Sequence, residues 1–243
     1  MRHKIIGVDE NSVCHELGIK PGDILVAIND QPVRDLLDYQ YYDAMNELTV
    51  TVIEKDSDEA VLYEIEKYDY EHLGLRFEND LLCMRSCANK CIFCFVDQLP
   101  PDMRKTLYVK DDDWRMSVLF GNYVTLTNVS EKEIQRIIDQ HISPLYISVH
   151  TTDTELRRYM LGNPKAQDIM GILRRFAEAE IYFHTQIVLC PEINDGFHLR
   201  QTFEDLFTLY PYCQSLAVVP VGLTYHRKKL HKFKIICRIK KKI

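Results

Sequence analysis

The stretch of sequence that decides the fold spans residues 81–94 and reads Leu81-Leu82-Cys83-Met84-Arg85-Ser86-Cys87-Ala88-Asn89-Lys90-Cys91-Ile92-Phe93-Cys94. Its apolar beginning is typical of a buried strand, and its second half is a loop with the spacing C-x3-C-x2-C. Thiolates are soft ligands, and such spacings let one loop surround an iron–sulfur cluster. Three thiols leave one iron of a [4Fe–4S] cluster open, as in catalytic metal sites. The loop therefore predicts a cluster bound by Cys87, Cys91 and Cys94.

Two other interpretations of this loop are open. It could bind zinc, or the spacing of its cysteines could have arisen by chance. Cys83 lies four residues before Cys87 and would complete the four ligands that a zinc site needs. Cys83 nevertheless belongs to an apolar stretch, where a cysteine more often serves as a buried structural thiol. We therefore expect three ligands rather than four.

Downstream of this stretch, short apolar runs alternate with amphipathic segments. The runs predict strands at Leu81–Arg85, Tyr123–Thr127, Leu145–Val149, Tyr182–Leu189 and Ser215–Val219. The amphipathic segments predict helices at Glu131–Gln140, at Thr154–Ala179 with a break near Gly162, and at Leu199–Tyr210. Strand–helix repetition is typical of a parallel sheet, so residues 79–225 are expected to form a partial (β/α) barrel within an α/β protein.

Upstream, residues 1–78 have the pattern of a small β-rich domain. Strands are expected at Ile5–Val8 and Ile24–Asn29, and a hairpin is expected from Leu48–Glu54 and Val61–Glu66. Helices are expected after Ser12 and from Asp35 to Glu47. The order of these elements, with the turn Gly18-Ile19-Lys20-Pro21-Gly22-Asp23, resembles bacterial PDZ domains.

The resemblance to PDZ domains implies a partner with a free peptide C-terminus. No Gly-Leu-Gly-Phe-type loop precedes the first strand, which is a departure from the usual PDZ pattern. Residues 73–77, Leu73-Gly74-Leu75-Arg76-Phe77, would serve as that loop in a circularly permuted domain. They fit equally well as a strand that closes the domain, and both interpretations stay open.

Composition and charge exclude several other classes of protein. An apolar content of 46% and a charged content of 27% are ordinary for a globular chain, and no apolar run is long enough to span a membrane. Three of the eight cysteines fall within eight residues, which favours metal binding in a reducing, cytoplasmic compartment over disulfides. Residues 226–243 hold nine bases and no acid, while the remainder has a net charge of −15. We interpret this end as an aberrant or disordered tail, and do not expect nucleic acid as a partner.

The cysteine spacing, with Phe93 just before the last cysteine, resembles the signature of the radical-SAM superfamily. That resemblance implies that the open iron binds S-adenosylmethionine and that an electron from an external donor cleaves it. The product is a 5′-deoxyadenosyl radical that abstracts hydrogen from a substrate. The motif follows the first expected barrel strand, on the face where barrel enzymes hold their sites.

The same resemblance places further residues around S-adenosylmethionine. A Gly-Gly-Glu-like segment normally holds the methionine amino group; here the position reads Thr125-Leu126-Thr127-Asn128, so hydroxyl and amide oxygens replace the acid. Thr125 and Thr127 also fit plain strand propensity. Polar residues near strand ends add Ser148, His150 and Gln186 as expected contacts. The segment Asp111-Asp112-Asp113 is expected to be a solvated loop, or a lid neutralised by Arg115.

From residue 5 to about residue 227, the sequence resembles one bacterial radical-SAM family, on motifs that include Phe95-Val96-Asp97-Gln98-Leu99-Pro100, Gly121-Asn122-Tyr123-Val124 and Gln186-Ile187-Val188-Leu189-Cys190-Pro191. Its members join a PDZ-like domain to a radical-SAM core and a C-terminal domain of unknown function. Against that pattern, this chain reads as truncated or frame-shifted. The leading hypothesis is a radical-SAM oxidoreductase of unknown substrate and unknown catalytic residues. The alternative is a non-catalytic PDZ-type binding protein with a redox-sensing iron–sulfur or zinc site.

Overall fold

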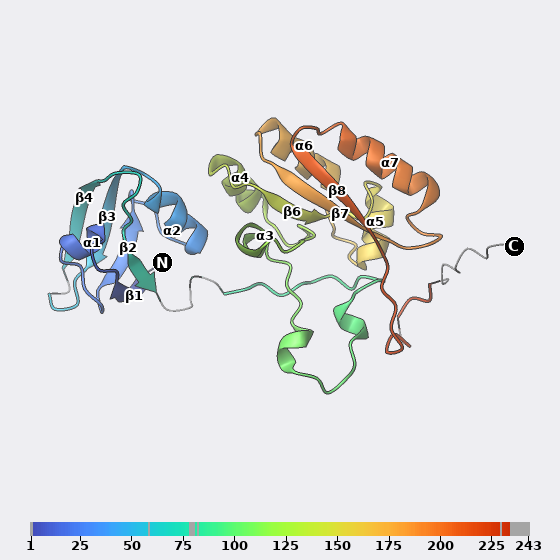
Figure 1. Cartoon of the computed structure of the whole chain (residues 1–243), viewed down its shortest axis with the longest axis horizontal. Helices are drawn as coiled ribbons and strands as arrows, with labels where there is room; N and C mark the ends of the chain where they lie inside the picture. The colour runs from blue at the N-terminus through green and yellow to red at the C-terminus, as the bar shows by residue number, and fades with distance from the viewer. Residues whose placement is uncertain (1, 58, 78–80, 82, 229, 234–243) are drawn as a thin grey trace, which may run out of the picture. The chain divides into compact units, whose positions relative to one another are not determined.

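The computed structural model describes residues 2–57, 59–77, 81, 83–228 and 230–233. The chain divides into two compact units, Met1–Cys83 and Met84–Ile243, whose elements are drawn in Figure 1. The domain boundary expected at residue 78 falls on residues 78–80, which lie outside the described residues. Within the described ranges, no helix combines the length and the apolar character that crossing a bilayer requires.

The first unit is an antiparallel sheet with two short helices. Its strands are β1 (His3–Val8), β2 (Ile24–Ile28), β3 (Glu47–Ile53), β4 (Ala60–Glu66) and β5 (Leu75–Phe77), in the order β4-β3-β2-β1-β5. The expected hairpin is confirmed, with Val50 opposite Tyr63. Strand β5 pairs with β1, so residues 75–77 are a closing strand of this sheet.

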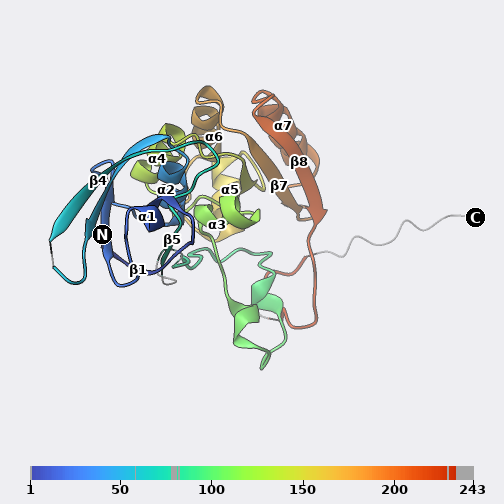
Figure 2. The ribbon, with the colours of Figure 1, turned by 60° about the vertical axis from the view of Figure 1, so that its left-hand side comes forward.

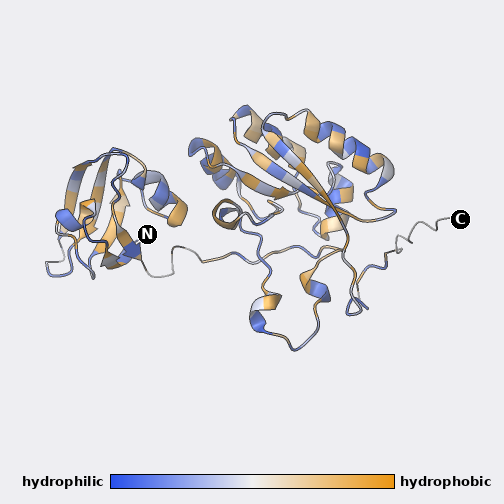
Figure 3. Ribbon diagram, in the orientation of Figure 1, coloured by the Kyte–Doolittle hydropathy of each residue, from blue (hydrophilic) through white to orange (hydrophobic). Residues whose placement is uncertain are grey.

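Local sequence signals explain the helices of the first unit. Helix α1 (Val13–Glu16) is capped by the Ser12 hydroxyl and α2 (Leu36–Asp43) by the Asp35 carboxylate, because each accepts a hydrogen bond from an otherwise unpaired amide. Hydrophobic and hydrophilic residues alternate along the strands (Figure 3), as expected for a sheet with one buried face. The buried face includes Ile5, Leu25 and Val50, none of which is exposed.

The second unit contains a three-stranded parallel sheet flanked by helices (Figure 2). Its strands are β6 (Leu145–Ser148), β7 (Phe183–Leu189) and β8 (Cys213–Pro220), in the order β6-β7-β8. Its helices are α3 (Trp114–Phe120), α4 (Glu131–Asp139), α5 (Thr154–Leu161), α6 (Ile169–Glu178) and α7 (Gly196–Phe207). The expected break near Gly162 separates α5 from α6, and the capping box of Ser130 and Glu133 opens α4.

The other two strand predictions for the second unit are wrong, because the described residues of these segments form no regular strand. Near Tyr123–Thr127, only an isolated bridge joins Val124 to Ile147, and Leu126 adopts a left-handed backbone with φ 58°, which ends an extended run. At Leu81–Arg85, where residue 82 lies outside the described residues, the described positions form no strand. Arg85 instead pairs its backbone amide with the Asp113 carboxylate. The unit is therefore mixed α/β, and a partial barrel is not confirmed.

Candidate functional site

The cysteine loop is attached to the end of helix α5. The backbone amides of Lys90 and Ile92 donate to the carbonyl oxygens of Leu161 and Met160, each at 2.9 Å. These carbonyls belong to the last turn of the helix, where no amide of the helix itself can reach them. Gly162 follows with φ +57°, and a Cβ at this position would lie 2.4 Å from the Lys90 carbonyl oxygen. Only glycine therefore lets the loop approach the helix end this closely.

The three thiols of this loop lie within one another's electrostatic reach. Burial, together with the neighbouring thiols of Cys87 and Cys94, raises the pKa of Cys91 to about 12. All three side chains are partly buried, and Cys94 donates its backbone amide to the Cys91 carbonyl at 3.0 Å. As placed in the described part of the chain, no three metal-ligating side chains converge closely enough to hold one metal ion. Cys83, the fourth ligand of the zinc alternative, is exposed.

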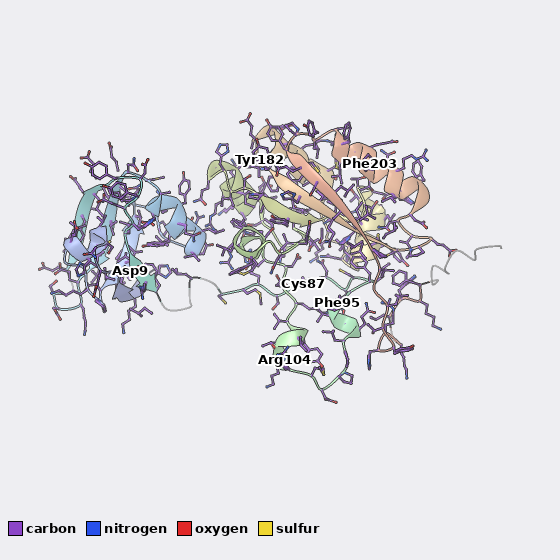
Figure 4. The ribbon with its side chains drawn as sticks, in the orientation of Figure 1. Asp9, Cys87, Phe95, Arg104, Tyr182 and Phe203 are labelled. Atoms are coloured by element: carbon purple, nitrogen blue, oxygen red, sulfur yellow. The ribbon has the colours of Figure 1, made fainter. Side chains whose placement is uncertain are left out.

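A cavity of about 320 Å³ opens beside Cys91 and Cys94, a size within the usual range for small-molecule sites. Five of the expected contacts with S-adenosylmethionine line it: Phe93, Thr125, Ser148, His150 and Gln186. Three expected residues, Cys87, Thr127 and Asn128, do not line it. Figure 4 shows Cys87 and Phe95, another lining residue, on the long segment that precedes α3.

Beneath Thr125, the buried carboxylate of Asp112 collects four hydrogen bonds. Its Oδ1 accepts the Thr125 backbone amide at 2.6 Å, and its Oδ2 accepts the Thr125 hydroxyl at 2.5 Å. Oδ2 also accepts from the side chains of Asn89 at 3.2 Å and Thr127 at 3.3 Å. Burial raises the pKa of Asp112, which these hydrogen bonds and the charge of Arg157 counteract. The carboxylate of Asp112 therefore holds Thr125, one of the residues that line the cavity.

Asn89 connects the cysteine loop to this buried network. Its Oδ1 accepts from the Asn163 side chain at 2.8 Å and from the Thr127 hydroxyl at 3.0 Å. Its Nδ2 donates to the Thr125 hydroxyl at 2.9 Å as well as to Asp112. The hydroxyl groups of Thr125 and Thr127 are therefore held in place by hydrogen bonds to Asn89 and Asp112.

A buried arginine fixes the strand ends around the same point. The Arg157 guanidinium donates to the backbone oxygens of Thr125 at 2.7 Å, Val149 at 3.1 Å and Ser148 at 3.3 Å. Burial lowers the pKa of Arg157 to about 10, so the group stays protonated at neutral pH. The cation of α5 thus orients the two segments that carry Thr125 and Ser148.

His150 is held neutral in the wall of the cavity. Its Nδ1 accepts the backbone amide of Val188 at 3.2 Å, so the proton of the neutral ring must sit on Nε2. Burial, together with the charge of Arg157, lowers the pKa of His150 to about 3. Its ring packs against Phe93 with 4.5 Å between centroids. His150 therefore presents a neutral imidazole beside the cysteine loop.

The acidic run is not a solvated loop or a lid, because Asp112 and Asp113 are buried. Asp113 caps helix α3 and pairs with Arg115, which is the neutralisation that the sequence suggested. Sequence reasoning missed the role of Asp112 and that of Asn89. Their spacing in the chain gives no signal, since they meet only after residues 85–87 pair with residues 110–113. Asn128 has a buried Oδ1 without a hydrogen-bond partner among the described residues.

Comparison with known proteins gives two matches to protein families. Residues 67–216 match the family described as a Radical SAM-like domain. Residues 4–52 match a PDZ domain. No curated protein matches the chain. The two matched ranges follow the order that the sequence predicted, with the β-rich domain before the cysteine loop.

Proposed function

This chain belongs to the radical SAM-like domain family, and from that premise we propose that it is an enzyme that reductively cleaves S-adenosylmethionine. The observation that carries the proposal is the cavity that brings Cys91 and Cys94 together with Thr125, Ser148, His150 and Gln186. A loop of three thiols beside a ligand-sized cavity suits a cluster with one open iron better than a closed structural metal.

The residues present fit a [4Fe–4S] cluster by the chemistry of their donors. Cys87, Cys91 and Cys94 supply three thiols from one loop, and thiolates are the ligands that iron–sulfur clusters take. When bound, the cluster would supply the electron that breaks a carbon–sulfur bond of S-adenosylmethionine and generates the 5′-deoxyadenosyl radical. The electron would come to the cluster from an external reductant.

The chain's own residues bind and orient the ligand in this proposal. The Thr125 hydroxyl, backed by the Asp112 carboxylate, favours a cationic ammonium group at that end of the cavity. Neutral His150 and the side chain of Phe93 offer an apolar surface with one donor, which suits a planar base or ribose. Gln186 offers both a donor and an acceptor at the same wall.

We infer a second role for the first unit, which is docking a protein partner. The PDZ match of residues 4–52 supports recognition of a peptide C-terminus. Such docking would bring a substrate protein or a reductant to the enzyme. Binding of a C-terminal peptide library to the isolated first unit, compared with amidated peptides of the same sequence, tests this role. Loss of binding on amidation is expected, and equal binding of both forms would contradict it.

The proposed site is tested by metal content. Anaerobic reconstitution of the whole chain with iron and sulfide should give about four irons per chain, with visible charge-transfer absorption. Cys91→Ala should abolish that absorption, while Cys83→Ala should retain it. Equal loss in both variants would favour a four-cysteine site. Stoichiometric zinc that iron cannot replace would favour the non-catalytic alternative.

A further inference from the structure

Gln98, four residues after the last cysteine of the loop, is a buried side chain whose amide is fully hydrogen-bonded. Only 1% of it is exposed. Its Nε2 donates to the carbonyl oxygens of Cys94 at 3.2 Å and Gly222 at 3.0 Å. Its Oε1 accepts from the Thr224 backbone amide at 3.0 Å and from the Arg227 guanidinium at 3.1 Å. Both donors and both acceptor positions of one amide are thus used.

These bonds join two segments that are far apart in the sequence. Cys94 belongs to the cysteine loop, whereas Gly222 and Thr224 follow the end of strand β8. Thr224 adds a third link, because its hydroxyl donates to the Gln98 backbone oxygen at 2.6 Å. Gln98 and Gly222 both line the cavity beside the thiols. The segment after β8 is therefore a wall of that cavity, and Gln98 attaches it.

Arg227, which lies in the region expected to be an aberrant tail, also links the cysteine loop to the segment after β8. Its guanidinium donates to the Ile92 carbonyl of the cysteine loop at 3.1 Å and to the His231 carbonyl at 2.6 Å. The bond to Gln98 makes a third contact. Residues 229 and 234–243 lie outside the described residues, so these contacts concern only the first part of that region.

We propose that Gln98 is a positioning residue that fixes the cysteine loop to the segment after β8, with Arg227 as its second anchor. The importance of this loop for metal binding rests on the proposed function, whereas the attachment itself does not. A glutamate of the same shape would replace the Nε2 donor by a carboxylate oxygen, which would face the Cys94 and Gly222 carbonyl oxygens as a third acceptor. An alanine would leave those two carbonyls, and the Thr224 amide, without a partner.

The first test uses the metal-free chain and measures how fast iodoacetamide alkylates each cysteine, read by peptide mass spectrometry. Gln98→Ala and Gln98→Glu should each speed alkylation of Cys94 about tenfold relative to exposed Cys83, because losing two buried hydrogen bonds shifts a local opening equilibrium by roughly that factor. Gln135→Ala is the matched control, since Gln135 is exposed and makes a single side-chain bond to Asp139. An unchanged ratio of Cys94 to Cys83 in both Gln98 variants would overturn the proposal.

A second measurement separates positioning from a general loss of folding. Thr224→Val removes the hydroxyl that donates to the Gln98 backbone oxygen and accepts the His226 amide. It leaves the side-chain bonds of Gln98 in place, so it should speed Cys94 alkylation by a smaller factor than Gln98→Ala while leaving the unfolding midpoint unchanged. In the reconstituted chain, Gln98→Glu should shift the reduction potential of the cluster, because hydrogen bonds and charge near the thiolates set it. The proposal would be contradicted if Cys94 were alkylated at the natural rate in Thr224→Val and the reduction potential of the cluster were unchanged in Gln98→Glu. If the Gln98 variants speed Cys94 alkylation but the natural chain takes up no iron, the attachment of the loop is supported and the proposed function is contradicted.

Discussion

The side-chain amide of Asn89, in the middle of the cysteine loop, donates a hydrogen bond of 3.2 Å to the buried carboxylate of Asp112. The two residues lie 23 positions apart and both are buried. This bond connects the loop that carries the thiols to the segment that carries Thr125, because Asp112 also accepts the Thr125 amide and hydroxyl. The geometry of the candidate site therefore depends on a carboxylate that faces no solvent.

Asp112→Asn should destabilise the second unit more than the neighbouring change Asp111→Asn. The new amide group would turn an NH2 toward donors that now point at Asp112, which costs about 1–3 kcal/mol. Asp111 is only partly buried, and Asn122 is its side-chain partner, so Asp111→Asn should cost about 0.5 kcal/mol or less. Urea unfolding followed by fluorescence of Trp114, the one tryptophan of the chain, reports on this unit. Equal midpoints for the two variants would show that the Asp112 network adds no stability.

Gly162→Ala should disrupt the cysteine loop, whereas Gly196→Ala should not. Both glycines have positive φ, +57° and +53°, so alanine pays a similar backbone cost of about 1–2 kcal/mol at either position. Only at Gly162 does the new Cβ meet the Lys90 carbonyl oxygen, at 2.4 Å; nothing lies within 4 Å at Gly196. Gly162→Ala should therefore lower iron uptake as well as stability. Full iron uptake by Gly162→Ala would contradict the described docking of the loop on α5.

His150 should make the second unit less stable in acid. Its pKa is lowered to about 3 in the folded chain, from an ordinary value of 6.5. Between these values the unfolded chain binds the extra proton, so the free energy of unfolding falls as pH decreases from 6.5 toward 3. His150→Asn keeps a residue that tolerates the positive φ of 64° at this position, and it should flatten this part of the stability profile. The profile comes from urea unfolding at a series of pH values; identical slopes in both chains would exclude His150 as the cause.

The first unit should fold by itself, because residues 1–83 form a separate compact unit with its own core. A fragment of these residues should show one cooperative thermal transition. Leu25→Ala should lower its stability by about 2–5 kcal/mol, since Leu25 is fully buried. Leu62→Ala is the matched control at a side chain that is 55% exposed, and should change stability little. A non-cooperative trace for the unaltered fragment would refute independent folding.

Much of the fold could be predicted because the deciding signals were local. The caps at Ser12 and Ser130, the break at Gly162 and the alternation in β3 and β4 each depend on neighbouring residues. The expected strand at 123–127 failed because its residues bond to Asp112 and because Leu126 leaves the extended conformation. Neither cause can be read from a short window of sequence.

The sequence identified the residues of the candidate site that belong to recognisable local patterns. It did not identify the contacts between residues that lie far apart in the chain. The candidate cysteines, Phe93 and Thr125 were proposed from family motifs, and Ser148, His150 and Gln186 from their positions near strand ends; the last five of these residues line the cavity. In contrast, the attachment of Gln98 to Gly222 spans 124 positions, and that of Asn163 to Asn89 spans 74. Glutamine and asparagine on the surface are common, so their residue types alone give no signal of burial.

The most direct test of the proposed function is the formation of 5′-deoxyadenosine by the whole chain. The protein is reconstituted anaerobically with iron and sulfide, given S-adenosylmethionine and dithionite, and compared with Cys91→Ala under the same conditions. The proposed function predicts 5′-deoxyadenosine and methionine in equal amounts from the natural chain, and neither above background from Cys91→Ala. A natural chain that carries its full complement of iron and sulfide, accepts the electron and leaves S-adenosylmethionine intact would contradict it.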